Sequence, residues 1–195
     1  MTGSSDRLRG STITTLETER LLIRNFHRGD ADALVAIITR YMASDLAAYD
    51  QPWPTSPEKI REVTAWFASG DNYLAVCLKE TGQLIGFVAL NPEGPADQRT
   101  FNLGYVFHFD VHGKGYASEA CRALLAHAFE HYQAARVVTG TASLNLASCR
   151  LLQRLGFQKM GECITSFRNA PDGKPIQFLG YLFELSRNMW ENLIE

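Results

Sequence analysis

The residues of this chain with the clearest chemical potential form the run from His112 to Ala117, His-Gly-Lys-Gly-Tyr-Ala. It lies between an expected strand and an expected long helix. Glycine lets a backbone approach a ligand closely, and the N-terminus of a helix offers free N–H groups at the positive end of its dipole. Lys114 adds a positive charge. Together these features predict a cradle for a phosphate or pyrophosphate group, and an ordinary tight strand-to-helix turn is the alternative.

Spacing excludes two well-known phosphate-binding motifs. A P-loop has Ser or Thr directly after its Gly-Lys, where this chain has Gly115. The dinucleotide fingerprint G-x-G-x-x-G needs a third glycine where this chain has Ser118, and it follows an early strand rather than one in mid-chain.

Composition is that of an ordinary globular protein. The chain has 195 residues, 46% of them hydrophobic and 21% charged, with a formal net charge of −2 at pH 7. These values exclude a disordered chain and a disulfide-dense mini-protein. The near-neutral charge argues against a nucleic-acid partner, which would require a basic excess. We expect a disordered tail over residues 1–12 and one domain over residues 13–195.

The four cysteines lie far apart, and no C-x-x-C pair suggests a zinc or redox site. Their neighbours are largely apolar, so we expect reduced, buried thiols at Cys77, Cys121, Cys149 and Cys163. Residues 1–12 lack the apolar region of a signal peptide, and no apolar run approaches the roughly 20 residues of a membrane span. We therefore expect a cytoplasmic protein without a membrane partner.

The elements that must position the cradle follow from hydrophobic periodicity and turn residues. Asp30 and Ser56 are expected to begin two helices, and Gly156 to end the last one. The expected order is β-α-α-β-β-β-α-β-α-β-β, a mixed sheet with helices on both faces. The strands are expected over residues 16–24, 73–78, 84–90, 101–109, 136–141, 158–167 and 176–185, and the two later helices over 116–132 and 145–155.

Three segments resemble the GNAT acetyltransferase superfamily. Residues 104–120, with the sequence GYVFHFDVHGKGYASEA, resemble its acyl-CoA-binding motif. Asn-Leu-Ala-Ser at 145–148, followed by Arg-Leu-Gly-Phe at 154–157, looks like the N-x-x-S…LGF signature of the branch that includes the ribosomal-protein N-terminal acetyltransferases. Residues 16–24 are similar to the first strand of that branch. The resemblance spans residues 14–185 and implies an α/β, GNAT-like fold: a mixed, mostly antiparallel sheet of about seven strands, with about four helices on both faces.

The resemblance also implies acetyl-CoA as the acyl donor. In the family, the strand before the glycine turn splays from its neighbour and pairs with the pantetheine arm, and a bulge would expose the groups that do so. The pyrophosphate would lie on the N–H groups of the glycine turn, whereas His112 departs from the usual Arg, Gln or aromatic residue. The implied cofactor-binding residues are Phe107, His108, Phe109, His112, Gly113, Lys114, Gly115, Tyr116, Ala117 and Asn145.

Acetyl transfer to an amine requires a neutral amine, a donor for the oxyanion and an acid for the departing thiolate. Many family members use a tyrosine four residues before the LGF glycine as the acid, and this chain has Leu152 there. In the N-terminal-acetylating branch the Ser of N-x-x-S resembles a substitute, so Ser148 and Asn145 are the catalytic candidates. The alternatives are a hydroxyl that serves the helix backbone and a helix N-cap. Direct attack is expected, because no cysteine has an activating Cys-His setting.

The general base is less well specified. The candidates are Glu162, His108 and a water held by Asn102. An α-amine, with a pKa near 8, needs less help from a base than a lysine side chain, with a pKa near 10.4. The lack of an evident strong general base therefore favours a protein or peptide N-terminus as acceptor. The alternatives are a small-molecule amine (amino sugar, polyamine or antibiotic) and a non-catalytic acyl-CoA-binding module.

The segment that joins the first two helices borders the acceptor groove in GNAT folds. Two prolines hold an irregular loop there that would display Trp53. Tyr49, Trp53 and Asn102 are therefore the candidate substrate-binding residues. Family analogy alone suggests a homodimer through the C-terminal strands.

A zinc-peptidase pattern is also present. His127, Glu130 and His131 fit H-x-x-E-H, but their helix follows the glycine turn of another motif, and no ligand helix is evident downstream. We expect two solvent-facing histidines and no metal site.

Overall fold

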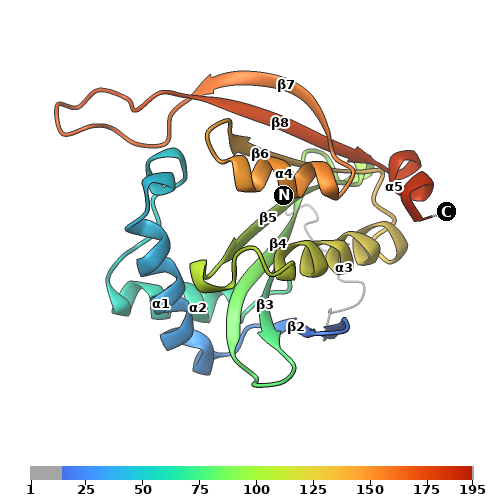
Figure 1. The fold of residues 1–195 in the computed structure, drawn as a ribbon, viewed down its shortest axis with the longest axis horizontal. Helices are drawn as coiled ribbons and strands as arrows, with labels where there is room; N and C mark the ends of the chain where they lie inside the picture. Colours follow the sequence, from blue (N-terminus) through green and yellow to red (C-terminus); the bar gives the residue numbers. More distant parts are fainter. Residues whose placement is uncertain (1–14, 195) are drawn as a thin grey trace, which may run out of the picture.

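The computed structural model describes residues 15–194, which form one eight-stranded sheet with helices on both faces (Figure 1). The expected tail over residues 1–12 lies outside the described residues. The strands are β1 (Thr15–Glu17), β2 (Leu21–Asn25), β3 (Tyr73–Leu78), β4 (Leu84–Glu93), β5 (Thr100–Phe107), β6 (Arg136–Ala142), β7 (Gln158–Thr165) and β8 (Phe178–Ser186). The α-helices are α1 (Ala31–Met42), α2 (Pro57–Phe67), α3 (Tyr116–Glu130), α4 (Leu146–Arg154) and α5 (Arg187–Ile194). Short 3-10 turns are η1 (Arg28–Asp30), η2 (Asp45–Tyr49), η3 (Ala96–Gln98) and η4 (Phe109–Val111).

The expected fold class is confirmed, with one more strand and one more helix. The sheet order is β1-β2-β3-β4-β5-β6-β8-β7, and every neighbouring pair is antiparallel except β5 and β6. The expectation of a single first strand is wrong, because Thr18 folds it into a hairpin. The Thr18 hydroxyl accepts from the amide of Leu21 at 2.9 Å and so stabilises the turn between β1 and β2. The unexpected helix α5 buries Trp190, whose ring stacks on Phe129 at 5.4 Å.

Two hydrophobic cores lie on opposite faces of the sheet. One packs α3, α4 and α5 against the sheet, and the other packs α1 and α2 against the opposite face. On β3, Leu74 and Val76 enter the first core, whereas Ala75 and Cys77 enter the second. A strand buried on both faces reads as a continuous apolar run, and burying each large apolar side chain contributes roughly 1.5–3 kcal/mol.

The expected cap of α1 has a different role. Asp30 stands at the N-cap position, yet its side chain does not cap the helix. Its carboxylate accepts two 2.8 Å hydrogen bonds from Arg24 and one of 2.9 Å from the amide of His27. Burial opposes the charge of Asp30, but these hydrogen bonds outweigh it and lower its pKa. The interaction joins β2 to the start of α1.

Two expectations about side-chain exposure are wrong. Cys163 is exposed, while the other three free cysteines are buried. It lies on the edge strand β7 opposite Gly180, where no large side chain covers it. His127 is 8% exposed rather than solvent-facing, because it lies on the inner side of α3, where its ring stacks on His131 at 4.4 Å. Its Nε2 has no hydrogen-bond partner among the described residues. No group of metal-ligating side chains is found in the part of the chain that the structure describes.

Buried His127 should make the fold sensitive to acid. Burial lowers the pKa of His127 below its usual 6.5, as does the neighbouring His131, against a smaller opposing effect of Glu130. As the pH falls through about 6.5, the unfolded chain therefore takes up a proton before the folded one. Stability that is fully present above that pH is lost below it. Urea unfolding should show that the free energy of unfolding falls less between pH 7 and pH 5 in His127→Leu than in the parent chain. An equal fall in the two proteins would contradict this role.

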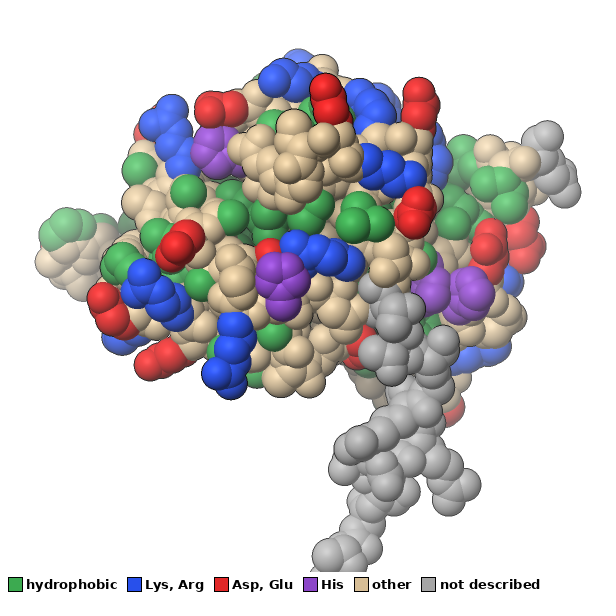
Figure 2. Space-filling view, turned by 90° about the horizontal axis from the view of Figure 1, so that it is seen from below, with side chains coloured by type: hydrophobic (Ala, Val, Ile, Leu, Met, Phe, Trp, Pro, Cys, Tyr) green, Lys and Arg blue, Asp and Glu red, His purple; other side chains and the backbone are tan. Residues whose placement is uncertain are grey.

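Charges of both signs are interspersed over the face seen in Figure 2, in keeping with the net charge of −2. Among the described residues no helix has the length and apolar character needed to cross a membrane.

Candidate functional site

The glycine turn, residues 112–117, forms a row of unused backbone N–H donors ahead of α3. Gly113 and Gly115 have φ angles of +76° and +85°, the left-handed region that glycine adopts without strain. Gly115 is the N-cap of α3, and no acceptor for the amides of residues 113–118 is found among the described residues. A Cβ placed on Gly113 would meet nothing within 4 Å, so the space at the turn is open. The donors, the helix dipole and exposed Lys114 fit a phosphate or pyrophosphate group.

Next to the turn, the sheet opens between β5 and β6. Their parallel pairing covers only residues 100–102 of β5 and 136–138 of β6, and beyond it β6 is paired with β8 alone. This confirms the expected splay. The expected bulge is wrong, because β5 pairs with β4 without a register shift from Thr100 to Phe107. The open edge follows from the end of the β5–β6 ladder.

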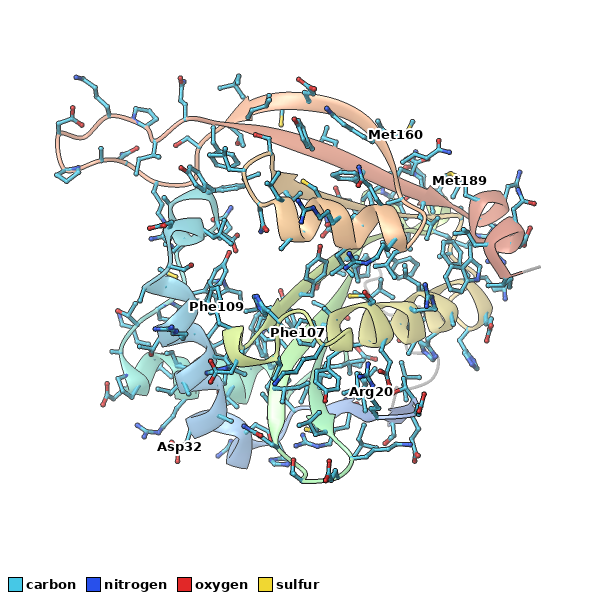
Figure 3. The ribbon with its side chains drawn as sticks, in the orientation of Figure 1. Arg20, Asp32, Phe107, Phe109, Met160 and Met189 are labelled. Carbon is cyan, nitrogen blue, oxygen red and sulfur yellow. The ribbon has the colours of Figure 1, made fainter. Side chains whose placement is uncertain are left out.

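The residues that follow β5 differ from an extended strand. The strand ends at Phe107, whose side chain is buried. His108 caps η4, and Phe109 lies within that turn, beside the start of α3 (Figure 3). His112 lies 4.8 Å from the Phe109 ring, and its Nε2 is 3.1 Å from the Phe107 carbonyl oxygen. His112 is one of the residues expected to bind the acyl donor. In the structure its ring contacts the chain itself, at the backbone that ends β5.

On the far side of the opening, a serine hydroxyl of α4 meets a tyrosine hydroxyl of β5. Asn145 caps the helix by accepting from the amide of Ser148 at 3.1 Å. The side chain of Ser148 is largely buried, and its Oγ lies 2.7 Å from the phenol oxygen of Tyr105 on β5. Burial raises the pKa of Tyr105, so its phenol stays protonated at neutral pH. Tyr105 is absent from the predicted site, because no spacing in the sequence links it to a residue on α4.

The three candidate bases each have another partner. Asn102 donates to a carboxylate oxygen of Glu93 at 2.8 Å. The Glu162 carboxylate forms an ion pair with Lys159 on the edge strand β7. His108 accepts from the amide of Asp110 at 3.3 Å.

Two segments distant in sequence meet at the other end of the opening. Figure 1 shows the long loop between β7 and β8 reaching toward η2. Arg168 of that loop donates to the carbonyl of Asp50 at 3.2 Å, and the Asp50 carboxylate accepts from the Tyr41 hydroxyl at 2.7 Å. The Tyr49 ring lies 5.4 Å from Phe178, at the start of β8.

The second aromatic candidate lies elsewhere. The Trp53 ring packs edge-on against Phe67 at 6.2 Å and Phe87 at 5.8 Å, at the margin of the second core. Trp53 is half-buried, so the loop displays only part of its indole. The other part makes apolar contacts with the core.

Residues 20–158 match the family model of the acetyltransferase (GNAT) domain. The match begins in the β1–β2 turn, includes the glycine turn and α4, and covers more than half of the chain. The chain belongs to the GNAT acetyltransferase family. The resemblance inferred from the three sequence segments is thereby confirmed, as is an acyl-CoA-dependent N-acetyltransferase activity.

Relatives of known sequence fit this assignment. The uncharacterized N-acetyltransferase YnaD of Bacillus subtilis is 27% identical over 148 residues, covering 75% of this chain and 84% of YnaD. A probable spermine N(1)-acetyltransferase of Bacillus subtilis subsp. natto is 35% identical over 95 residues, covering 46% of this chain and 62% of that protein.

Solved structures share the fold. A GNAT-family acetyltransferase of Bacillus anthracis superposes with a TM-score of 0.77 at 24% identity, covering 90% of this chain and 99% of that one. The ribosomal-protein-S5-alanine acetyltransferase of Vibrio fischeri superposes with a TM-score of 0.74 at 19% identity, covering 91% and 98%. At these identities the likeness establishes the fold, and the acceptor has to be inferred from the site.

Proposed function

We propose that this GNAT acetyltransferase moves the acetyl group of acetyl-CoA to the α-amine of a protein or peptide, by direct attack. The observation that carries the choice of acceptor is the state of two carboxylates, Asp50 and Glu162. Both oxygens of Asp50 are engaged, one by the Tyr41 hydroxyl and the other by the amide of Gln51 at 2.7 Å. Glu162 is paired with Lys159. A polycationic acceptor would need free carboxylates, whereas an N-terminus with a pKa near 8 needs neither a strong base nor a charged pocket.

Within this proposal, the donor is held by two stretches of backbone. The free amides of residues 113–118 would bind its phosphates, and the open edge of β5 would pair with the pantetheine arm. Bound there, acetyl-CoA supplies an activated acetyl group and a thiolate leaving group.

The proton for that thiolate would come from Ser148. The Ser148 hydroxyl lies within hydrogen-bond distance of Tyr105, so the serine oxygen would take the phenol proton in turn, and the proton that the acetylated amine loses would restore the phenol. Before and after the reaction this pair holds an acid without a charged group in a buried place. It would fill the role that Leu152 leaves vacant.

The two cysteines near Tyr105 favour direct attack over an acyl-enzyme. Cys149 lies next to Ser148 but is buried, and burial raises the pKa of its thiol. Burial also raises the pKa of Cys121. Since the thiolate is the nucleophilic form, neither residue is suited to accept the acetyl group.

Thiol release from acetyl-CoA tests the acceptor. Three pools should be compared: lysine-free peptides with free α-amines, the same peptides with blocked α-amines and an added lysine, and spermine. We expect release with the first pool alone, and mass spectrometry of its products would name the preferred first residue. Release only with blocked peptides or only with spermine would overturn the proposed acceptor. If calorimetry shows that acetyl-CoA binds but none of the three pools releases thiol, both the proposed acceptor and the proposed direct transfer would be overturned.

A further inference from the structure

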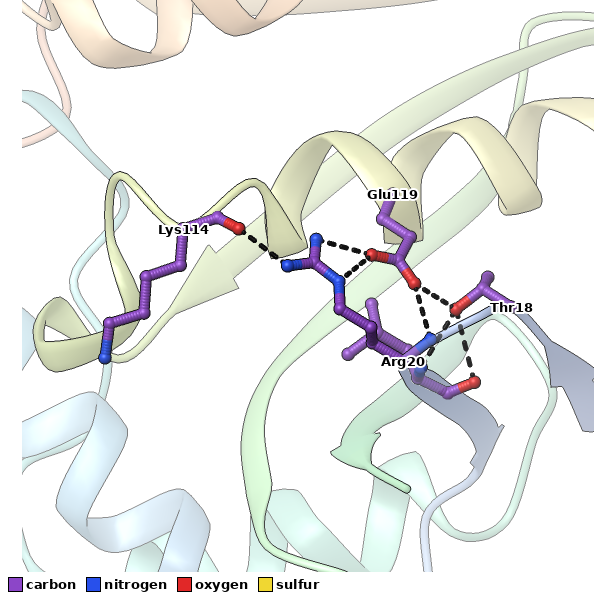
Figure 4. A network of polar contacts seen from close by, with 5 residues as sticks. Thr18, Arg20, Lys114 and Glu119 are labelled. Carbon is purple, nitrogen blue, oxygen red and sulfur yellow. Dashed lines mark hydrogen bonds and ion pairs between the residues drawn. The ribbon is translucent and has the colours of Figure 1, made fainter. Parts of the chain in front are cut away.

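Arg20 lies outside the glycine motif in sequence but against it in space. The residue belongs to the turn between β1 and β2 and reaches the start of α3 (Figure 4). Its Nη1 donates to the carbonyl of Lys114 at 3.0 Å, and its Nε donates to the carboxylate of Glu119 at 2.7 Å. The guanidinium also lies over the Tyr116 ring, 4.4 Å from its centroid. A single side chain thus contacts three residues of the turn and the first helical turn.

The bond to Lys114 orients a donor. In a trans peptide the carbonyl oxygen and the following N–H point in opposite directions. The peptide between Lys114 and Gly115 is trans, because the described chain has no cis peptide bond. When Arg20 holds the Lys114 oxygen, the N–H of Gly115 must point away from Arg20. The guanidinium therefore fixes the direction of one of the cradle's free donors.

The bond to Glu119 neutralises an unfavourable charge. Glu119 lies in the first turn of α3, next to the place where a phosphate would bind. Burial opposes ionisation of Glu119, but hydrogen bonds from Thr18 and from the backbone and side chain of Arg20 outweigh it and lower its pKa. Unpaired, that carboxylate would repel an anion and compete with it for the helix dipole.

We propose that Arg20 is a positioning residue for the phosphates of the acyl donor. It holds the glycine turn from the side of the β1–β2 hairpin and cancels the charge of Glu119, so that phosphate affinity depends on a residue 95 positions before Gly115 in the chain. The inference rests on the proposed binding of acetyl-CoA at this turn.

The test compares two acyl donors, acetyl-CoA and S-acetylpantetheine, which lacks the phosphates. In Arg20→Ala, kcat/KM for acetyl-CoA should fall at least about tenfold, the scale of one lost charge-assisted hydrogen bond. The value for S-acetylpantetheine should stay within about twofold, because its binding makes no use of the phosphate cradle. A general loss of structure would lower both values equally. The double variant Arg20→Ala, Glu119→Gln should recover part of the loss, since it removes the uncompensated charge.

Arg136 offers a matched control. Its side chain is 45% exposed against 43% for Arg20. Like Arg20 it bonds to one neutral oxygen, the Thr100 hydroxyl, and to one glutamate, Glu184. Arg136→Ala should leave the ratio of the two donors unchanged. Arg20→Lys keeps the charge but lacks the planar fork, and should give an intermediate ratio if the alanine variant folds poorly.

Two results would overturn the inference. An unchanged donor ratio in both Arg20 variants, whether both values fall equally or neither falls, would show that Arg20 has no role in phosphate binding. If the parent enzyme itself used both donors equally well, the cradle would not recognise phosphates at all. That second result would overturn the proposed use of the glycine turn together with the inference, whereas the first would leave it intact.

Discussion

Replacement of Ser148 by alanine is expected to lower kcat about a hundredfold and to leave KM for acetyl-CoA within about twofold. A positioned acid contributes on the order of 10²–10⁴ to rate, and the serine hydroxyl is the group proposed to protonate the leaving thiolate. Tyr105→Phe removes the partner 2.7 Å away and keeps the ring in place, so a smaller loss of about tenfold is expected.

The two substitutions should not add. If Tyr105 acts through Ser148, the double variant should be about as slow as Ser148→Ala alone. Steady-state kinetics on the three variants would measure this, with Ser143→Ala as the control for a nearby hydroxyl. A kcat for Ser148→Ala within threefold of the parent would rule out its role as the acid.

The second large effect is expected from Gly86→Ala, which should lower the free energy of unfolding by about 3 kcal/mol. Gly86 of β4 pairs with Phe107 of β5. An added Cβ would lie 2.5 Å from the carbonyl oxygen of Val106 and 2.9 Å from the Cα of Phe107. Both are backbone atoms, so the clash cannot be relieved by rotating a side chain, and β4 and β5 must move apart.

Gly140→Ala is the matched control, because the nearest atom to its added Cβ is a carbonyl oxygen at 3.7 Å, an ordinary contact. Urea unfolding should show a change below about 0.5 kcal/mol for this variant. Since β5 also forms one wall of the opening, Gly86→Ala should raise KM for acetyl-CoA as well. A Gly86 variant as stable as the Gly140 variant would contradict the close approach of the two strands.

Features that depend on neighbouring residues were largely determined by the sequence. Asn145 caps α4, and Gly156, at φ +87°, follows its end as its position indicates. Gly113 and Gly115 adopt the conformations that a turn before a helix requires. These features could be predicted because a cap or a left-handed glycine is selected within a few residues of chain. The repeat of apolar residues likewise predicted β3, β4 and α3 closely, since each repeat reports which side of the element is buried.

What the sequence left undecided are contacts between distant segments. Thr18 bends the first strand into a hairpin, and only the position of that hairpin beside α3 brings Arg20 to the glycine turn. Tyr105 and Ser148 are 43 residues apart and meet because β5 and α4 lie on the two sides of the opening. His127 is buried and Trp53 half-buried by the packing of whole elements, which their own neighbours in sequence do not reveal. Local backbone chemistry therefore determined the helix caps and the glycine turn, the three motifs indicated the family, and tertiary packing decided which side chains lie beside the proposed site.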